Sequence, residues 1–168
     1  MIIVKVKHLE FETEFPKIYF FNITQDIKDF IAESGIKNGT VTVQSEHTTC
    51  AVFFEEWVHD EDRKGHDYLQ IDLNNGLRRI FPDEVEFDGY YKYPGPKHLG
   101  RPDRPYLPFD GVCLNGPAHL KSTLIGASQT FVIENGVLQT GTWGSVWFVD
   151  FDYLRPRKRK VVMCVMGE

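Results

Sequence analysis

Residues 40–54 run Thr-Val-Thr-Val-Gln-Ser-Glu-His-Thr-Thr-Cys-Ala-Val-Phe-Phe, and this stretch indicates the fold more clearly than any other. Its two ends, 40–45 and 50–54, are rich in Thr, Val and Phe, which are the residue types that favour β-strands. A short polar break at 46–49 separates them. We therefore expect two consecutive strands that are joined by a polar turn.

Helix and strand patterns alternate on both sides of this stretch. Further strands are expected at 2–7, 15–21, 129–134, 137–140, 146–152 and 160–166, with a hairpin turn at Asn135-Gly136. Helices are expected from a cap at Thr24 to Gly35, from Asp60 or Asp62 towards Phe81, and at 118–124 after Pro117. The pattern predicts an α+β fold with a curved, mostly antiparallel sheet or barrel-like core and two or three helices.

The length and composition predict one domain. The chain has 168 residues, of which 42% are hydrophobic and 14% aromatic, enough for a core without disulfides or metals. We expect a single domain over 1–168 with a long loop at about 82–117, where seven of the nine prolines lie among six aromatic residues. Ordered loops of this length in compact domains are often functional.

Charge and cysteine usage restrict the partners and the compartment. With 19 basic and 24 acidic residues the net charge is −5, so a nucleic-acid binder is not expected. The basic run 155–160 is interpreted as a solvated turn between two strands, with an anion contact as the alternative. The apolar runs are too short to span a membrane, and the first residues do not resemble a signal peptide. The three cysteines cannot all pair and form no C-x-x-C motif, which fits a reducing compartment. Together these features predict a cytoplasmic protein that binds no membrane.

Three of the six histidines lie where a pocket is expected. His47 is in the polar break between two strands, His98 in the proline-rich loop, and His119 in the first turn of the third helix. Beside His119, Lys121 and the backbone N–H groups of the helix start suit an anion such as phosphate. The three histidines are a candidate metal set if the fold gathers them, because a catalytic zinc site needs three protein ligands. The alternative for each is a hydrogen-bonded structural histidine.

The same part of the sequence resembles the YjbQ-like family in three blocks. They are His-Thr-Thr-Cys-Ala-Val-Phe-Phe-Glu-Glu at 47–56, Pro-Ala-His-Leu-Lys-Ser-Thr-Leu-Ile-Gly at 117–126 and Asn-Gly-Val-Leu-Gln-Thr-Gly-Thr-Trp at 135–143. Their order and spacing match the family from about residue 40 onward. The chain departs from the family at Glu55, where Asn is usual, at Gly144-Ser145, where Gln-Gly is usual, and in its expanded loop. It therefore resembles a divergent member.

This resemblance implies an α+β homotrimer with a polar pocket that is lined by the two histidine blocks. The catalytic residues that it implies are His47, Glu56, His119 and Lys121, with Glu56 or Asp67 orienting a histidine. The substrate-binding residues that it implies are Thr48, Thr49, Ser122, Gly141, Thr142 and Trp143. A divalent metal, Mg²⁺ or Zn²⁺, on His47, His98 and His119 is a further expectation.

Three functions remain open at this point. The family is associated with a weak thiamin phosphate synthase activity, which implies a transferase that joins a pyrimidine pyrophosphate to a thiazole phosphate. The partner would then be a small phosphorylated substrate. The second function is a metal-dependent hydrolase of a small phosphorylated or acyl substrate. The third is a non-catalytic trimeric module that binds a small molecule or a metal.

Overall fold

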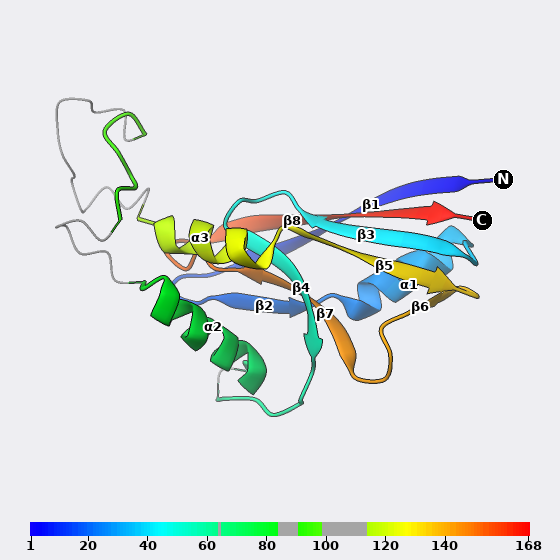
Figure 1. The fold of residues 1–168 in the computed structure, drawn as a ribbon, viewed down its shortest axis with the longest axis horizontal. Helices are drawn as coiled ribbons and strands as arrows, with labels where there is room; N and C mark the ends of the chain where they lie inside the picture. Colours follow the sequence, from blue (N-terminus) through cyan, green and yellow to red (C-terminus); the bar gives the residue numbers. More distant parts are fainter. Residues whose placement is uncertain (64, 84–90, 99–113) are drawn as a thin grey trace.

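Two antiparallel β-sheets form the framework of the computed structural model (Figure 1). The five-stranded sheet has the order β1 (Ile3–Thr13), β8 (Arg157–Gly167), β3 (Gly39–Ser45), β5 (Ser128–Glu134) and β6 (Val137–Leu138). The three-stranded sheet has the order β2 (Tyr19–Asn22), β7 (Gly144–Asp150) and β4 (Cys50–Glu56). The structure describes residues 1–63, 65–83, 91–98 and 114–168, so most of the loop expected at 82–117 lies outside the described residues.

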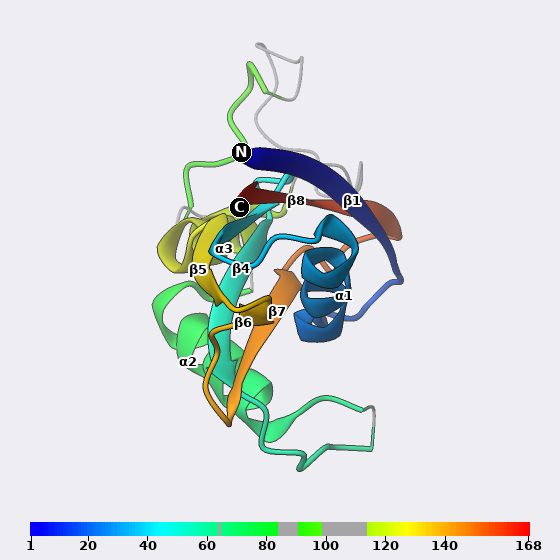
Figure 2. The same ribbon diagram turned by 90° about the vertical axis from the view of Figure 1, so that its right-hand side faces the viewer.

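Three helices accompany the sheets within this described part of the chain. Helix α1 (Thr24–Ser34) packs beside both sheets, whereas α2 (Tyr68–Ile80) and α3 (Gly116–Ile125) lie along the three-stranded sheet (Figure 2). The predicted α+β class, with a curved, mostly antiparallel sheet and two or three helices, is confirmed. Among the described residues, no helix combines the length and the hydrophobicity that a membrane span requires.

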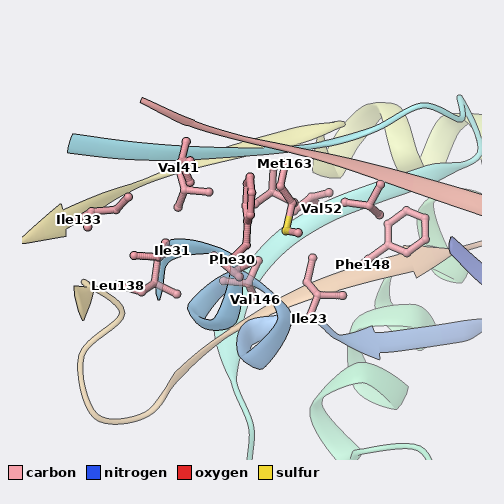
Figure 3. Packing of buried hydrophobic residues seen from close by; sticks show 14 of the residues in the cluster. Ile23, Phe30, Ile31, Val41, Val52, Ile133, Leu138, Val146, Phe148 and Met163 are labelled. Atoms are coloured by element: carbon pink, nitrogen blue, oxygen red, sulfur yellow. The ribbon is translucent and has the colours of Figure 1, made fainter. Parts of the chain in front are cut away.

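The three-stranded sheet is buried on both faces, because its residues enter two cores in alternation. Val52 and Phe148 pack with α1 and the inner face of the five-stranded sheet (Figure 3). Ala51 and Val149 face the opposite way and pack with α2 and α3. A strand that is covered on both faces has apolar side chains at successive positions. This explains why β4 and β7 have continuous apolar runs in place of an alternating pattern.

The first and last strands pair with each other along their whole length. Ile3 of β1 lies opposite Gly167 of β8, and Thr13 lies opposite Arg157. The N- and C-termini are therefore neighbours at one end of the five-stranded sheet (Figure 1). Both strands are longer than the sequence pattern predicts, since 2–7 and 160–166 cover only the part with the strongest strand propensity.

The two ends of α1 compare differently with the prediction. The helix stops at Gly35 as expected, with φ at 77° in the left-handed region that glycine favours. The expectation that Thr24 caps the helix is wrong, because Ile23 is the N-cap residue. The Thr24 hydroxyl donates to Asn22 Oδ1 (2.6 Å) and accepts the backbone N–H of Val146 (2.8 Å). It therefore connects the helix to β7.

Helix α2 begins later than predicted. Its N-cap is Asp67, whose carboxylate accepts the backbone N–H of Leu69 at 3.0 Å. The expected start at Asp60 or Asp62 is wrong, since both of these residues have non-helical backbone. All three aspartates are good N-cap residues, so composition alone does not distinguish them. The hairpin turn is confirmed, with positive φ at Asn135 (52°) and Gly136 (78°), as a type I′ turn requires.

Replacing Phe148 with Ala is expected to lower the free energy of unfolding by about 3–5 kcal/mol, because it leaves a cavity in the main core. Phe148 is fully buried and its ring lies 5.6 Å from that of Phe11. Urea denaturation of the purified variant measures the change. Val137→Ala, at a position that is 57% exposed, is the control and is expected to change stability by less than about 0.5 kcal/mol. Equal stability of Phe148→Ala and wild type would contradict this packing.

Candidate functional site

The two histidine blocks lie side by side at one end of the molecule, as expected. The turn between β3 and β4 carries His47, and α3 carries His119 (Figure 1). The hydroxyl of Ser122 faces the backbone carbonyl oxygens of Thr48 (2.5 Å) and His119 (3.0 Å). Ser122 is buried, so this hydroxyl connects the two segments and is not open to a substrate. Thr48 is exposed at the surface of the turn.

His47 is fixed in one orientation by the backbone. Its Nε2 accepts the backbone N–H of Lys160 at 2.8 Å. Burial lowers the pKa of His47, and the nearby Arg159 guanidinium adds to this effect. The ring is therefore neutral at neutral pH, and its single proton is on Nδ1 because Nε2 is an acceptor. In this arrangement His47 offers one N–H donor to a ligand.

The rings of His98 and His119 both lie close to the ring of Tyr93. The Tyr93 ring centroid is 5.0 Å from that of His98 and 5.6 Å from that of His119. His119 is half-buried against this ring, whereas His98 is exposed. Tyr93 is a site residue that sequence reasoning missed, since the long loop was expected to be functional without a particular residue. Its only signal was the high aromatic content of that loop.

A directed chain of hydrogen bonds runs inward from His98. The Tyr93 hydroxyl lies 3.2 Å from His98 Nε2 and donates its hydrogen to Asn115 Oδ1 at 3.2 Å. Asn115 Nδ2 in turn donates to Asp152 Oδ2 at 3.1 Å. Because Tyr93 gives its one hydrogen to Asn115, His98 must supply an N–H to the Tyr93 oxygen. The chain thus fixes both the position and the protonated nitrogen of His98.

Asp152 belongs to a buried network that the sequence analysis interpreted wrongly. The predicted solvated turn is confirmed only for Arg155 and Pro156, which are exposed between β7 and β8; from Arg157 onward the basic run is part of β8, and its residues alternate between two faces. Arg157 contacts Asp152 (3.2 Å) and Arg159 contacts Asp150 (2.7 Å) inside the protein. Lys158 and Lys160 face outward to glutamates of β1, at 3.6 Å and 3.2 Å. The matching spacings Asp-x-Asp and Arg-x-Arg were the available signal.

Thr49 and Lys121 belong to the interior and not to an open pocket. Thr49 Oγ1 accepts a hydrogen bond from Arg159 at 3.1 Å. Lys121 is fully buried, and its Nζ pairs with Asp83 at 2.5 Å and donates to Asn74 Oδ1 at 3.3 Å. Burial lowers the pKa of Lys121, while Asp83 acts in the opposite direction. Lys121 therefore connects α3 to α2 and to the segment that follows it, whereas we expected it to bind a phosphate.

The remaining expected site residues lie near the C-terminal end of β4, far from the turn that carries His47. Cys50 pairs with Asp150 at one end of this strand and Glu56 with Gly144 at the other. Seven residues of strand span about 20 Å. Gly141, Thr142 and Trp143 line a separate cavity of about 440 Å³ beside Glu56's end of the strand. Within one chain, the structure does not bring this third block to the two histidine blocks.

Asp67, the alternative residue for orienting a histidine, has its carboxylate oxygens on backbone groups. One oxygen accepts the N–H of Leu69 (3.0 Å) and the other accepts the N–H of His59 (3.1 Å). Glu56 is exposed at the end of β4. His47, His98 and His119 lie in three other segments of the chain, and neither carboxylate belongs to any of them.

The three expected metal ligands do not form a metal site together. In residues 1–63, 65–83, 91–98 and 114–168, no three His, Cys, Asp or Glu side chains are grouped as metal ligands. His47 Nε2 accepts a backbone N–H, and His98 Nε2 faces Tyr93. A zinc ion needs nitrogen ligands at ~2.0–2.1 Å from a common point. These histidines therefore do not fit a three-ligand site, and we assign no chemical step to a protein-bound metal.

The stability of the protein is expected to decrease at acidic pH because of His47. Its pKa is below the ordinary value of 6.5 in the folded state, so the unfolded state binds the proton more readily. Neutral His47 therefore contributes to the free energy of unfolding above pH 6.5, and this contribution is lost as the pH falls through the folded-state pKa. Urea denaturation between pH ~7.5 and ~5 measures this loss, which His47→Gln is expected to reduce.

The exposed His8 provides the control for this experiment. The variant His8→Gln is expected to keep the pH dependence that is assigned to His47. An NMR titration of the His47 ring with a midpoint at or above 6.5 would contradict the predicted direction.

Comparison with known proteins identifies relatives along almost the whole chain. The family described as UPF0047 protein YjbQ-like matches residues 7–168. The UPF0047 protein YugU of Bacillus subtilis is 30% identical over 146 residues, which are 87% of this chain and 88% of the relative. A UPF0047 protein of Methanothermobacter thermautotrophicus is 27% identical over 152 residues, covering 90% of this chain and 85% of the relative.

Solved structures show the same fold. A crystal structure of an uncharacterised conserved protein of the YjbQ/UPF0047 family from Clostridium acetobutylicum is 29% identical, with a TM-score of 0.66. The match covers 94% of this chain and 98% of the other. A YbjQ-like protein of unknown function from Sulfolobus solfataricus is 22% identical, with a TM-score of 0.68. The match covers 99% of this chain and 100% of the other, and it supports the fold alone. With the histidine blocks side by side and the family match over residues 7–168, the chain belongs to the UPF0047, YjbQ-like family.

Proposed function

We propose that the protein is a cytoplasmic transferase that acts on a small phosphorylated substrate where the β3–β4 turn, α3 and Tyr93 meet. The specific reaction is the thiamin phosphate synthase-like transfer that the family resemblance suggests. The observation that supports this site is the directed hydrogen-bond chain from His98 through Tyr93 and Asn115 to Asp152, beside His119. Such a chain fixes the orientation of an exposed histidine that would otherwise rotate freely.

The reaction needs groups that stabilise a departing pyrophosphate. The thiazole nitrogen attacks the methylene carbon of the pyrimidine, a C–N bond forms, and the C–O bond breaks with its electron pair remaining on pyrophosphate. Catalysis then depends on N–H donors at the position where the negative charge develops. The ring N–H groups of His47 and His119 are such donors at one end of the molecule, whereas His98 gives its Nε2–H to Tyr93 and presents Nδ1 as an acceptor.

The charges beneath this surface are balanced. Asp150 and Asp152 contact Arg157 and Arg159, so two buried carboxylates face two guanidinium groups. The hydrogen-bond chain therefore reaches His98 without adding net negative charge next to a phosphate. A divalent cation, Mg²⁺ or Zn²⁺, is proposed to enter with the substrate, because pyrophosphate oxygens bind such ions and the described side chains form no three-ligand group.

Replacing His119 with Gln is expected to lower the transfer rate by about a hundredfold or more, because the flexible amide does not hold its N–H where the imidazole N–H lies and cannot transfer a proton. The assay combines the pyrimidine pyrophosphate with the thiazole phosphate and measures thiamin phosphate and released pyrophosphate. Tyr93→Phe keeps the ring and removes the hydroxyl that orients His98, so a smaller loss is expected. Growth of a thiamin-requiring strain that lacks its own synthase tests the same variants in cells.

The control for this assay is His8→Gln, which alters an exposed histidine on β1 and is expected to leave the rate unchanged. Wild-type protein that forms no product above the uncatalysed rate would disprove the transferase. The same rate in His119→Gln and wild type would disprove the site.

We propose further that the protein is a homotrimer, which the resemblance suggests, and that its subunits meet through the outer face of the five-stranded sheet. Val4, Val6, Val132 and Met166 are each more than half exposed. They lie in register across neighbouring strands: Val4 is opposite Met166, Met166 is opposite Thr40, and Thr40 is opposite Val132. An exposed and largely apolar sheet face of this kind is typical of an interface between copies of a chain.

Light scattering coupled to size-exclusion chromatography is expected to give three times the mass of one chain. The double variant Val6→Lys and Val132→Lys is expected to elute as a monomer, because two lysines per subunit would be buried without partners in the interface. Leu124→Lys alters an exposed apolar residue of α3, away from this face, and is expected to remain a trimer. A wild-type protein with the mass of one chain would refute the assembly.

A further inference from the structure

A small cavity near the start of α2 is lined by three residues that each carry a buried polar atom without a partner. The cavity has a volume of about 180 Å³ and lies among β2, β7 and the loop before α2. Three buried atoms lack a hydrogen-bond partner in the described part of the chain, and they are His66 Nε2, Gln70 Oε1 and Trp147 Nε1. All three residues line this one cavity.

These atoms are buried deeply enough for their lack of partners to destabilise the protein. Gln70 is fully buried and Trp147 is 5% exposed. A buried donor or acceptor that loses its bond to water without gaining another is costly, and native proteins contain few of them. At position 70, on the inner side of α2, a leucine would avoid this cost. Three such atoms around one cavity therefore point to a molecule that completes their hydrogen bonds.

The three atoms define what that molecule must offer. Gln70 Nε2 donates to Glu55 at 3.3 Å, which leaves Oε1 as an acceptor. His66 Nδ1 faces the Asp62 carboxylate at 3.4 Å, so the ring carries its proton there and Nε2 is an acceptor. Trp147 Nε1 is a donor only. A primary carboxamide, with two N–H donors and one oxygen acceptor, offers the complement of two acceptors and one donor in a group larger than water.

The charge around the cavity favours a neutral molecule. Its lining includes the carboxylate residues Glu61 and Asp67, and among the described lining residues there is no lysine or arginine. Burial raises the pKa of Glu55 beside Gln70, and the Asp67 carboxylate contributes in the same direction. A second negative charge would be disfavoured in this environment. An anion such as a carboxylate or a phosphate therefore does not fit.

The walls of the cavity favour a flat ring. Phe20, Trp57 and Trp147 all line it, and the rings of Trp57 and Trp147 meet edge to face at 6.5 Å. Aromatic side chains in such arrangements form good contacts with a further planar ring. The volume of about 180 Å³ also exceeds the space of a single water molecule.

We propose that this cavity binds a small, neutral aromatic carboxamide. The amide N–H groups donate to Gln70 Oε1 and His66 Nε2, and the amide oxygen accepts the N–H of Trp147. The cavity shares Phe20 and His66 with a neighbouring cavity of about 680 Å³, which has room for a larger molecule that carries the amide. This site contains none of the residues that are proposed for transfer, so it does not rest on that function.

Calorimetry and ligand-observed NMR with nicotinamide, benzamide and nicotinate test the proposal. Both amides are expected to bind wild-type protein. Nicotinate has the same ring as nicotinamide with a carboxylate in place of the amide, and is expected to bind at least tenfold more weakly. Gln70→Leu and Trp147→Phe each remove one partner of the amide, so each is expected to weaken nicotinamide binding by tenfold or more.

Two controls separate this site from the others. Gln139→Leu alters an exposed glutamine and is expected to keep the affinity of wild type. His119→Gln is expected to bind nicotinamide normally, so failure of the transferase would not affect this result.

Four outcomes would overturn the proposal. They are no binding of either amide to wild type at millimolar concentration, equal binding of nicotinate, unchanged affinity in Gln70→Leu, and a crystal structure grown with nicotinamide in which water alone contacts the three atoms. The comparison of nicotinamide with nicotinate needs only wild-type protein. It therefore decides the question even if Trp147→Phe does not fold.

Discussion

The ion pair between Arg159 and Asp150 joins the two sheets at the end of the molecule that holds the histidines. Arg159 comes from the five-stranded sheet and Asp150 from the three-stranded sheet, and both are more than nine-tenths buried. Two charges in the interior are tolerated only when good geometry and further hydrogen bonds compensate for the lost water. Asp150 meets this condition, because it also accepts hydrogen bonds from Cys50 Sγ and Thr13 Oγ1. Burial, with Asp150 nearby, raises the pKa of Cys50, which stays a neutral thiol.

The positions of the candidate site residues follow from this pair. Arg159 also binds Thr49, and the Thr49 carbonyl accepts the N–H of Phe151, so the turn that carries His47 is held against β7 and β8. Asp152, two residues after Asp150, begins the chain that reaches His98. The surface where we place the transfer reaction is thus the outer layer of a buried polar cluster. Its geometry is set by the pairing of charges and not by the loop alone.

The sequence predicts the parts of this structure that depend on local patterns. Apolar runs mark β4 and β7, Gly35 marks the end of α1, and the Asn135-Gly136 turn marks a hairpin, because each depends on neighbouring residues. The proximity of His47 and His119 also follows from the family resemblance. The distance between Glu56 and these histidines does not, since it depends on β4 being one continuous strand with Glu56 at its far end. Likewise, the inward direction of Arg157 and Arg159 depends on their contacts with Asp152 and Asp150, which form only when β7 and β8 take their places in different sheets.

The pairing of β1 with β8 has a consequence for how the protein is assembled. The longest ladder of the five-stranded sheet joins residues that are separated by almost the entire sequence, with Ile3 opposite Gly167. Contacts of such high sequence separation form late and slow the search for the native topology. During synthesis, β8 leaves the ribosome after β1 and β3, and until it does, each of these two strands has an unpaired edge. The eleven residues of β8 therefore close the sheet and complete the buried charge cluster.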